Sequence, residues 1–137
     1  AILAAGVGIG SAINDLRFAI ANLGWSHGPI VRSTKAEGTG FARAYLKGCD
    51  GNKCDSCVVA FTGIEDVGTW RRLAFFEKLP LTSFCGAKRV HKAFSEGLRG
   101  FFQDENWKYL IRALSPQQCC RVYATGIDWG GSLASLF

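Results

Sequence analysis

Asp128 occupies the one position in this chain where residue spacing points to a reacting group. Gly126 lies two residues before it and Gly130 two residues after it. Small residues are needed there when a strand turns sharply into a helix and the central residue takes a positive φ, which presents its side chain. A carboxylate in that position is ionised at neutral pH and needs no base to activate it. The pattern predicts a strand–turn–helix elbow with Asp128 at its tip.

The segments on either side of Asp128 fit an elbow. Residues 121–124 alternate and are predicted as a strand, and the apolar run 133–137 is predicted to lie in the following helix. A second group of interest, Thr62-Gly63-Ile64, follows the continuous apolar run 57–61, which predicts a strand buried on both faces. Strands that alternate with helices favour a mixed or parallel sheet with helices on its faces.

Hydrophobic periodicity predicts most of the remaining elements. Apolar residues three and four apart predict a helix over 13–23 that ends at Gly24, followed by a loop over 24–40. Alternation predicts a strand over 41–46, and residues 50–52 are predicted as a hairpin turn. Residues 70–77 are predicted as helical or irregular.

The second half is dominated by one predicted helix. Residues 90–94 lead into a helix over 95–114, which Pro116 closes before a buried strand over 120–124. The residues expected on the buried side of this helix are Leu98, Phe101, Phe102, Tyr109, Leu110 and Leu114.

Length and composition indicate one globular domain. The chain has 137 residues, of which 48% are hydrophobic and 20% charged. The net charge is +5, but basic pairs such as Lys88-Arg89 are scattered between apolar segments without an aromatic ladder beside them. This pattern predicts a solvated basic surface and no nucleic-acid partner. Residues 1–13 are apolar apart from Ser11 and are shorter than a membrane span of about 20 residues. They fit the remains of a targeting segment, a mature N-terminus or a helix docked on a partner.

Cysteine content points to an oxidising compartment, either the secretory pathway or an organelle lumen. The chain has six cysteines, an even count that allows all of them to form disulfides. Adjacent Cys119 and Cys120 are not expected to bond each other, so at least one of them reaches elsewhere or stays free. The disulfide candidates are Cys49, Cys54, Cys57, Cys85, Cys119 and Cys120.

The order of segments over residues 38–137 resembles the front half of a class 3 (fungal-type) lipase of the α/β-hydrolase fold. In that family the elbow reads Thr-Gly-His-Ser-Leu-Gly-Gly-Ala-Leu-Ala, and residues 125–134 read Thr-Gly-Ile-Asp-Trp-Gly-Gly-Ser-Leu-Ala. The resemblance implies a partial α/β-hydrolase (lipase-like) fold, with a mixed or parallel sheet flanked by helices, that ends just after the elbow. Residues 1–37 then form a separate N-terminal apolar segment, helix and loop.

The departures from this family fall on its catalytic positions. Asp128 replaces the nucleophilic serine, and Thr62-Gly63-Ile64 replaces an Arg-Gly-Ser or Arg-Gly-Thr step whose hydroxyl helps to form the oxyanion hole. The family's acid and histidine follow the nucleophile, whereas His27 and His91 both precede Asp128. His91 is expected to be a structural hydrogen-bonder and His27 to be simply exposed.

The resemblance therefore implies a catalytically inactive, lipase-like domain without a cofactor or metal. Its expected role is that of a structural or interaction subunit in a larger protein assembly. Contact with a membrane through the apolar N-terminus is an open alternative, which would make the protein peripheral to that membrane.

Three chemical alternatives remain open at this point. Residues 126–130 are similar to the elbow of epoxide hydrolases and haloalkane dehalogenases, in which an Asp attacks carbon. Those enzymes carry a His-Gly-X-Pro loop where this chain has residues 62–65. A lipid esterase whose remaining catalytic residues lie after Phe137 is the second alternative. The third is a [2Fe–2S] protein, because Cys49, Cys54, Cys57 and Cys85 have a spacing that resembles plant-type ferredoxins.

Overall fold

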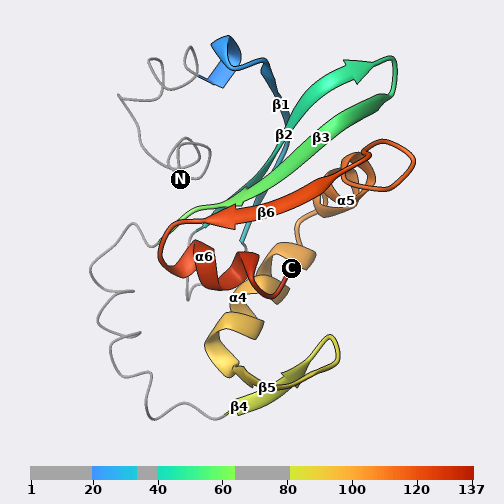
Figure 1. The fold of residues 1–137 in the computed structure, drawn as a ribbon. Coiled ribbons are helices and arrows are strands. Elements are labelled where there is room, and N and C mark those ends of the chain that lie inside the picture. Colours follow the sequence, from blue (N-terminus) through green and yellow to red (C-terminus); the bar gives the residue numbers. More distant parts are fainter. Residues whose placement is uncertain (1–19, 34–39, 64–80) are drawn as a thin grey trace.

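The computed structural model describes residues 20–33, 40–63 and 81–137 of the chain. They form a four-stranded sheet in the order β1-β2-β3-β6, a separate two-stranded sheet, and helices packed beside the larger sheet (Figure 1). The elements are β1 Trp25–Arg32, β2 Phe41–Asp50, β3 Lys53–Phe61, β4 Leu81–Phe84, β5 Ala87–His91, α4 Lys92–Phe102, α5 Trp107–Ala113, β6 Val122–Gly126 and α6 Trp129–Ala134. This is the mixed α/β arrangement expected from the sequence.

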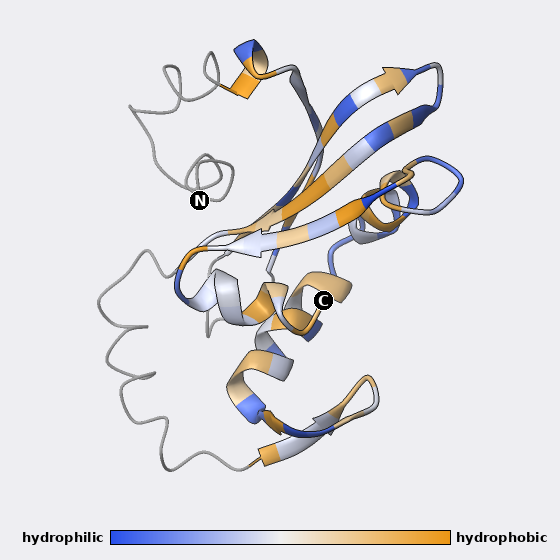
Figure 2. Ribbon diagram, in the orientation of Figure 1, coloured by the Kyte–Doolittle hydropathy of each residue, from blue (hydrophilic) through white to orange (hydrophobic). Residues whose placement is uncertain are grey.

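Strands β2 and β3 form the centre of the sheet, as predicted. They pair as an antiparallel hairpin across residues 51–52, where Gly51 has a φ of 57°. Residues 57–61 of β3 are all buried, which confirms a strand covered on both faces. Strand β6 runs parallel to β3, so residues 62–121 return the chain to the starting end of β3. Figure 2 shows hydrophobic residues along the middle of β2 and β3 and hydrophilic residues at their connecting turn.

The predicted loop over 24–40 is wrong, because residues 25–32 form β1, which pairs antiparallel with β2. The strand was missed because Gly28 and Pro29 are residue types that ordinarily indicate a loop. The register of β1 shifts between His27 and Ile30, around these two residues. Proline and a local irregularity are both tolerated on an edge strand, and β1 is the edge.

The single helix predicted over 95–114 is in fact two helices. Helix α4 ends at Phe102 and α5 begins at Trp107. Asp104, between them, accepts hydrogen bonds from the backbone N–H of Arg32 at 2.8 Å and of Asn106 at 2.7 Å. An aspartate that bonds backbone N–H groups outside the helix competes with helix continuation. Asp104 therefore ties the break between the helices to strand β1.

The break changes which side chains of this segment are buried. Phe102 and Tyr109 are 42% and 51% exposed, contrary to the prediction. The other four predicted core residues of the segment, Leu98, Phe101, Leu110 and Leu114, are buried.

The predicted buried strand over 120–124 is also corrected. It occupies residues 122–126 as β6, and Val122 and Tyr123 are 42% and 51% exposed. The reason is its place in the sheet: β3 lies on one side of β6, and no described strand lies on the other. The apolar composition of this segment resembles that of a central strand, although the strand lies at an edge.

The hairpin β4–β5 was not anticipated as a unit. Its two strands pair antiparallel around a turn at Cys85 and Gly86, whose φ values are 46° and 87°. Two consecutive positive φ angles are typical of a two-residue hairpin turn. The expected strand end at 90–94 is correct as far as His91, after which α4 begins.

Two groups of buried residues hold the sheet. The larger group fills the space between one face of the sheet and the three helices and includes Val59, Phe61, Leu98, Phe101, Leu110, Trp129 and Leu133. The smaller one, on the other face, contains Ile20, Tyr45, Val58 and Ala60. Residues 20–22 are helical, and the turn ends at Gly24, which has a φ of 78° and donates to the carbonyl of Ala21. The rest of the predicted helix over 13–23, the apolar segment 1–13 and the segment 70–77 lie outside the described residues.

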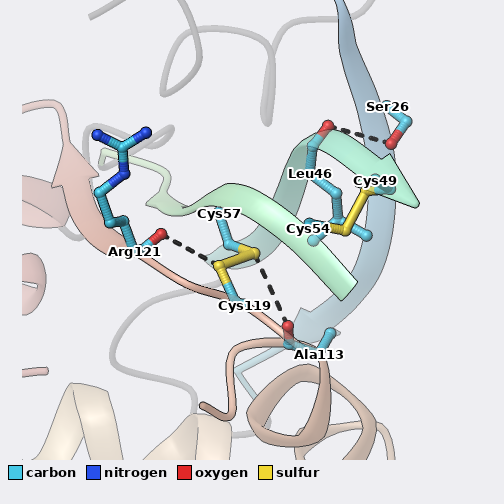
Figure 3. Close-up of a disulfide and its surroundings, with 8 residues drawn as sticks. All are labelled: Ser26, Leu46, Cys49, Cys54, Cys57, Ala113, Cys119 and Arg121. Atoms are coloured by element: carbon cyan, nitrogen blue, oxygen red, sulfur yellow. Dashed lines mark hydrogen bonds between the residues drawn. A yellow bond between two sulfur atoms is a disulfide. The ribbon is translucent and has the colours of Figure 1, made fainter. Parts of the chain in front are cut away.

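Two disulfides cross-link strand β3, one to β2 and one to the segment before β6. Cys49–Cys54 joins directly opposed residues of β2 and β3, with Cα atoms 3.8 Å apart. Cys57–Cys119 joins β3 to the segment that leads into β6 and lies over the end of α5, where the Cys57 sulfur is 3.9 Å from the carbonyl oxygen of Ala113 (Figure 3). Cys85 and Cys120 are free and exposed.

These bonds agree with the expectation that Cys119 and Cys120 do not pair with each other, and they are compatible with an oxidising compartment. Within the described part of the chain, no helix has both the length and the apolar character needed to cross a bilayer.

We predict that the two disulfides differ in their effect on stability. Cys57–Cys119 closes a sequence separation of 62 residues and Cys49–Cys54 one of 5. On the loop-closure model, removing the first by Cys57→Ala/Cys119→Ala lowers the free energy of unfolding by about 4 kcal/mol, and Cys49→Ala/Cys54→Ala by about 2 kcal/mol. Urea denaturation of both double variants measures the difference. Equal losses would contradict the loop-closure argument.

Candidate functional site

The elbow predicted at Asp128 is present. Strand β6 ends at Gly126 and helix α6 begins at Trp129, and Asp128 between them has a φ of 56° and a ψ of −118°. Its side chain is exposed and makes no capping hydrogen bond to α6. Non-glycine residues in such a backbone conformation cost about 1–3 kcal/mol and persist only where the surroundings enforce them. The turn therefore presents the carboxylate of Asp128 to solvent in a strained, fixed geometry.

Close backbone contacts explain the glycines on either side of Asp128. A Cβ atom on Gly126 would overlap the backbone of Gly130, and one on Gly130 would overlap the carbonyl groups of Phe61 and Thr62. The start of α6 therefore lies directly against the ends of β6 and β3. Any larger residue at either position would push the helix away from the sheet.

Thr62 and Gly63 lie beside this elbow. A Cβ atom on Gly63 would be 3.0 Å from the carbonyl oxygen of Ile127 and 3.7 Å from the Cβ atom of Asp128. Thr62 is 4% exposed, and its hydroxyl oxygen accepts a hydrogen bond from the backbone N–H of Phe41 at 2.8 Å. Thr62 also donates its own N–H to the carbonyl of Phe41 at 2.9 Å. The hydroxyl is thus used to hold β2 and β3 together. Ile64, the third residue of this step, lies outside the described residues.

Trp129 fastens the elbow to helix α4, a role that the sequence did not reveal. Its side chain is 7% exposed and its ring centroid is 4.7 Å from that of Phe94. A Cβ atom on Gly97 would be 2.9 Å from Cζ2 of Trp129, so Gly97 leaves room for the indole. A cue was available, because Gly97 is a glycine inside a segment predicted to be helical. Trp129 is a core residue that fixes the direction of α6.

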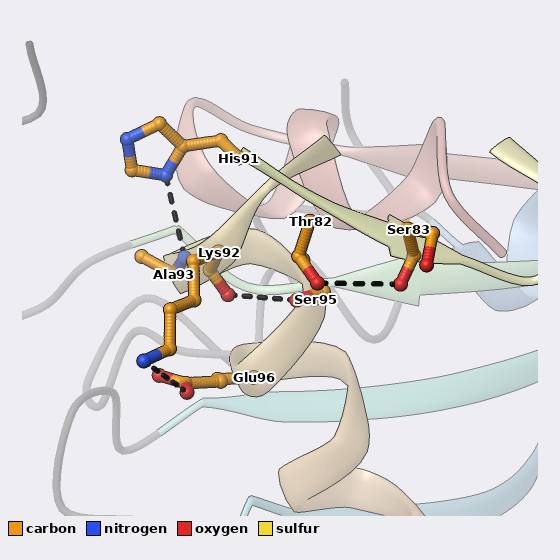
Figure 4. A network of polar contacts seen from close by, with 7 residues as sticks. All are labelled: Thr82, Ser83, His91, Lys92, Ala93, Ser95 and Glu96. Atoms are coloured by element: carbon orange, nitrogen blue, oxygen red, sulfur yellow. Dashed lines mark hydrogen bonds and ion pairs between the residues drawn. The ribbon is translucent and has the colours of Figure 1, made fainter. Parts of the chain in front are cut away.

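The two histidines have structural contacts. His91 precedes α4, and its Nδ1 atom accepts a hydrogen bond from the backbone N–H of Ala93 at 3.3 Å, which confirms the predicted structural role (Figure 4). His27 is exposed as expected, but its ring also lies 5.4 Å from that of Tyr45, and its Nδ1 atom is 3.5 Å from Nη1 of Arg43. His91 caps a helix, and His27 lies on β1 across from Tyr45 on β2.

A cavity of about 290 Å³ lies at the opposite end of the sheet from the elbow. It is lined by Leu46, Cys49, Gly51, Asn52, Cys54, Ala113 and Gln118. The hairpin end of β3 and the elbow are separated by most of the nine-residue length of that strand. This hollow therefore does not extend the elbow site.

The cysteines proposed as iron–sulfur ligands are used differently. Cys49 and Cys54 are bonded to each other, and Cys57 is bonded to Cys119. Cys85 lies in the exposed turn between β4 and β5. Cluster ligation needs free thiolates, and three of these four sulfurs are disulfide-bonded. In the described part of the chain no three His, Cys, Asp or Glu side chains form a group suited to a metal ion.

Comparison of the chain with protein-family models, with curated proteins and with solved structures found no match. The mixed α/β arrangement thus stands on the structure, and the lipase-like interpretation remains a prediction from the residue pattern. The turn at Asp128 is a local feature of the structure that the lipase-like interpretation predicted.

We predict that Gly130→Ala destabilises the fold strongly and Gly131→Ala does not. A methyl group on Gly130 meets two backbone carbonyls, whereas one on Gly131 would be 3.4 Å from its nearest neighbour, which is ordinary contact. The expected loss of unfolding free energy for Gly130→Ala is about 3 kcal/mol. Gly131→Ala should be neutral or stabilising, because alanine favours helix. Thermal and urea denaturation of the pair test this, and a similar effect of both variants would refute it.

Replacing Asp128 by glycine is expected to stabilise the protein. Glycine adopts positive φ without strain, so Asp128→Gly should raise the free energy of unfolding by about 1 kcal/mol. Asp128→Ala is the matched control, because it removes the carboxylate but keeps the strain. If Asp128→Gly is less stable than the parent, the carboxylate itself contributes to folding.

Proposed function

We propose that residues 38–137 form a catalytically inactive, lipase-like domain that acts as a structural or interaction subunit in a larger protein assembly. The observation that carries this proposal is the elbow itself. Its backbone turns as a nucleophile elbow does, with Asp128 at a φ of 56° between Gly126 and Gly130, while the residue it presents is a carboxylate. Acyl transfer from an ester to a carboxylate would form an anhydride, which is less stable than the ester. The presented group therefore does not suit lipase chemistry.

The loop after β3 supports the same conclusion. An oxyanion hole needs donors aimed at the developing charge, and one such donor lowers the barrier by about 3 kcal/mol. The Thr62 hydroxyl is buried against Phe41. Gly63 lies against Ile127 and Asp128. The carboxylate of Asp128, next to Gly63, would repel an oxyanion at this loop rather than stabilise it.

A role in assembly is supported by the exposed apolar residues at the edge of the sheet. Val122, Tyr123 and Ile127 are each more than 40% exposed. Apolar side chains along an edge strand are a common site of protein–protein contact. The two disulfides favour the secretory pathway or an organelle lumen as the location of that assembly. Peripheral membrane contact through residues 1–13 is part of the same proposal.

One observation favours a second candidate, an Asp-nucleophile hydrolase. The carboxylate of Asp128 is exposed on a strained turn, and stored strain is frequent at functional sites. In this reaction a carboxylate oxygen of Asp128 attacks an epoxide carbon, the carbon–oxygen bond of the ring breaks, and the ring oxygen takes a proton from water. Water then hydrolyses the ester and regenerates the carboxylate.

The first test is restoration of a serine. We predict that neither the parent protein nor Asp128→Ser hydrolyses p-nitrophenyl esters of short or long acids above the rate without protein. The reason is that the serine alone recovers neither a general base nor an oxyanion hole. Asp128→Ala provides the background. Robust hydrolysis by Asp128→Ser would show that only the nucleophile has been lost.

The second test separates the two candidates. Incubation with an aryl epoxide should leave the intact mass of the protein unchanged and release no diol if the domain is inactive. Release of diol that is absent from Asp128→Asn would indicate turnover through a short-lived ester. An added mass equal to the epoxide, mapped to Asp128 and absent from Asp128→Asn, would favour the Asp-nucleophile reaction. Labelling that persists in Asp128→Asn would indicate reaction at another group, such as exposed Cys85 or Cys120.

A further inference from the structure

Strand β6 exposes hydrogen-bonding groups along its outer edge. The N–H of Cys57 donates to the carbonyl of Arg121 at 2.8 Å, and Cys57 pairs with Val122 in the parallel register. In a parallel ladder alternate residues bond to the same neighbour. The backbone groups of Tyr123 and Thr125 therefore point to β3, and those of Val122 and Ala124 point away from the sheet. No described strand pairs with them.

The two edges of the sheet differ in how they are protected. Edge strand β1 contains Pro29, a register irregularity and terminal Arg32, which are usual devices against pairing with another chain. Strand β6 reads Val-Tyr-Ala-Thr-Gly, without proline, charge or irregularity in its pairing. Such an edge favours the addition of another strand.

Within the proposed interaction role, on which this inference rests, we propose that β6 pairs with β6 of a second copy of this chain. The two strands run antiparallel, with the two-fold axis at Ala124. The outward N–H and C=O groups of each Ala124 then bond to those of the other. An isologous contact of this kind needs only one surface, used twice. The two four-stranded sheets would become one continuous sheet.

Side-chain size and charge favour this register. Centring on Ala124 places Val122 opposite Gly126 of the second copy, where the absence of a side chain leaves room for the valine. It also places Arg121 beside Ile127 of the second copy, one residue along the chain from Asp128, so the charged groups near each other at each end of the paired strands are opposite in sign. Centring on Val122 would instead place Arg121 opposite Tyr123, with no acid next to it along that strand. Exposed ion pairs contribute little affinity, so their role is to select the register.

The first experiment measures the oligomeric state of the complete chain. Light scattering after size exclusion, over a range of concentrations, is expected to give twice the monomer mass for the parent and for Ala124→Thr, which keeps the outward N–H. Ala124→Pro is expected to be monomeric and folded, because the N–H it removes makes no bond within the sheet. Arg121→Glu should shift the equilibrium towards monomer, with a smaller shift at high salt.

A cross-linking experiment tests the register and does not depend on the proline variant folding. In a background with Cys85→Ser and Cys120→Ser, Ala124→Cys should form a disulfide-linked dimer under mild oxidation. Directly opposed, hydrogen-bonded residues have Cα atoms about 5.5 Å apart, within the reach of a disulfide. Arg89→Cys, exposed on the separate hairpin, is the matched control and should remain monomeric.

Several results would overturn the proposed dimer. These are a monomer at every concentration, association that Ala124→Pro leaves unchanged, growth beyond dimers, or equal cross-linking at positions 124 and 89. A monomer whose Ala124 amide is protected from hydrogen exchange would show that another segment of the same chain covers the edge. None of these outcomes bears on hydrolysis, so absence of the dimer and failure of the inactive-domain proposal are separate results.

Discussion

The fold depends on a backbone contact that only glycine permits. Gly126 and Gly130 bring the start of α6 against the ends of β6 and β3, where the carbonyl groups of Phe61 and Thr62 occupy the space that a Cβ atom would need. This contact fixes where α6 leaves the sheet and forces the positive φ at Asp128. With α6 so placed, Trp129 packs against Phe94 on α4. One constraint thus determines the turn, the direction of the helix and the exposure of the carboxylate.

A second constraint comes from the parallel pairing of β3 and β6. Parallel neighbours require a long connection, here residues 62–121, and bringing its ends to the sheet costs conformational entropy. The Cys57–Cys119 disulfide and the hydrogen bond from the Cys57 N–H to the Arg121 carbonyl hold the last residues of this connection against β3. Asp104 contributes from the middle, because it bonds β1 to the break between α4 and α5. The covalent bond and the glycine contact therefore anchor β6 at its opposite ends.

Local signals in the sequence predicted the elbow, the β2–β3 hairpin and the buried strand β3, because each depends on residues close together in the chain. The predictions that were wrong share one cause, because each of them depends on contacts between residues far apart in the chain. Asp104 ends α4 by bonding Arg32, 72 positions away, and β1 exists because β2 pairs with it despite Gly28 and Pro29. The exposure of Val122 and Tyr123 reflects the position of β6 in the sheet, which composition does not encode. The packing of Trp129 against Gly97 likewise cannot be predicted until the fold is known.

The elbow and the edge strand bear on each other because they share β6. A hydrolase presents its nucleophile at the end of a strand so that a substrate reaches it from solvent. If a second chain adds to β6, its Arg121 comes close to Asp128 and its strand runs past Ile127, so the carboxylate becomes part of an interface. The contact between Gly126 and Gly130 produces the strained turn at Asp128. The same contact ends β6 at Gly126 and so limits the length of the edge that another strand can pair with. Under the proposed pairing, the elbow at Asp128 has a role in assembly and does not require a reaction.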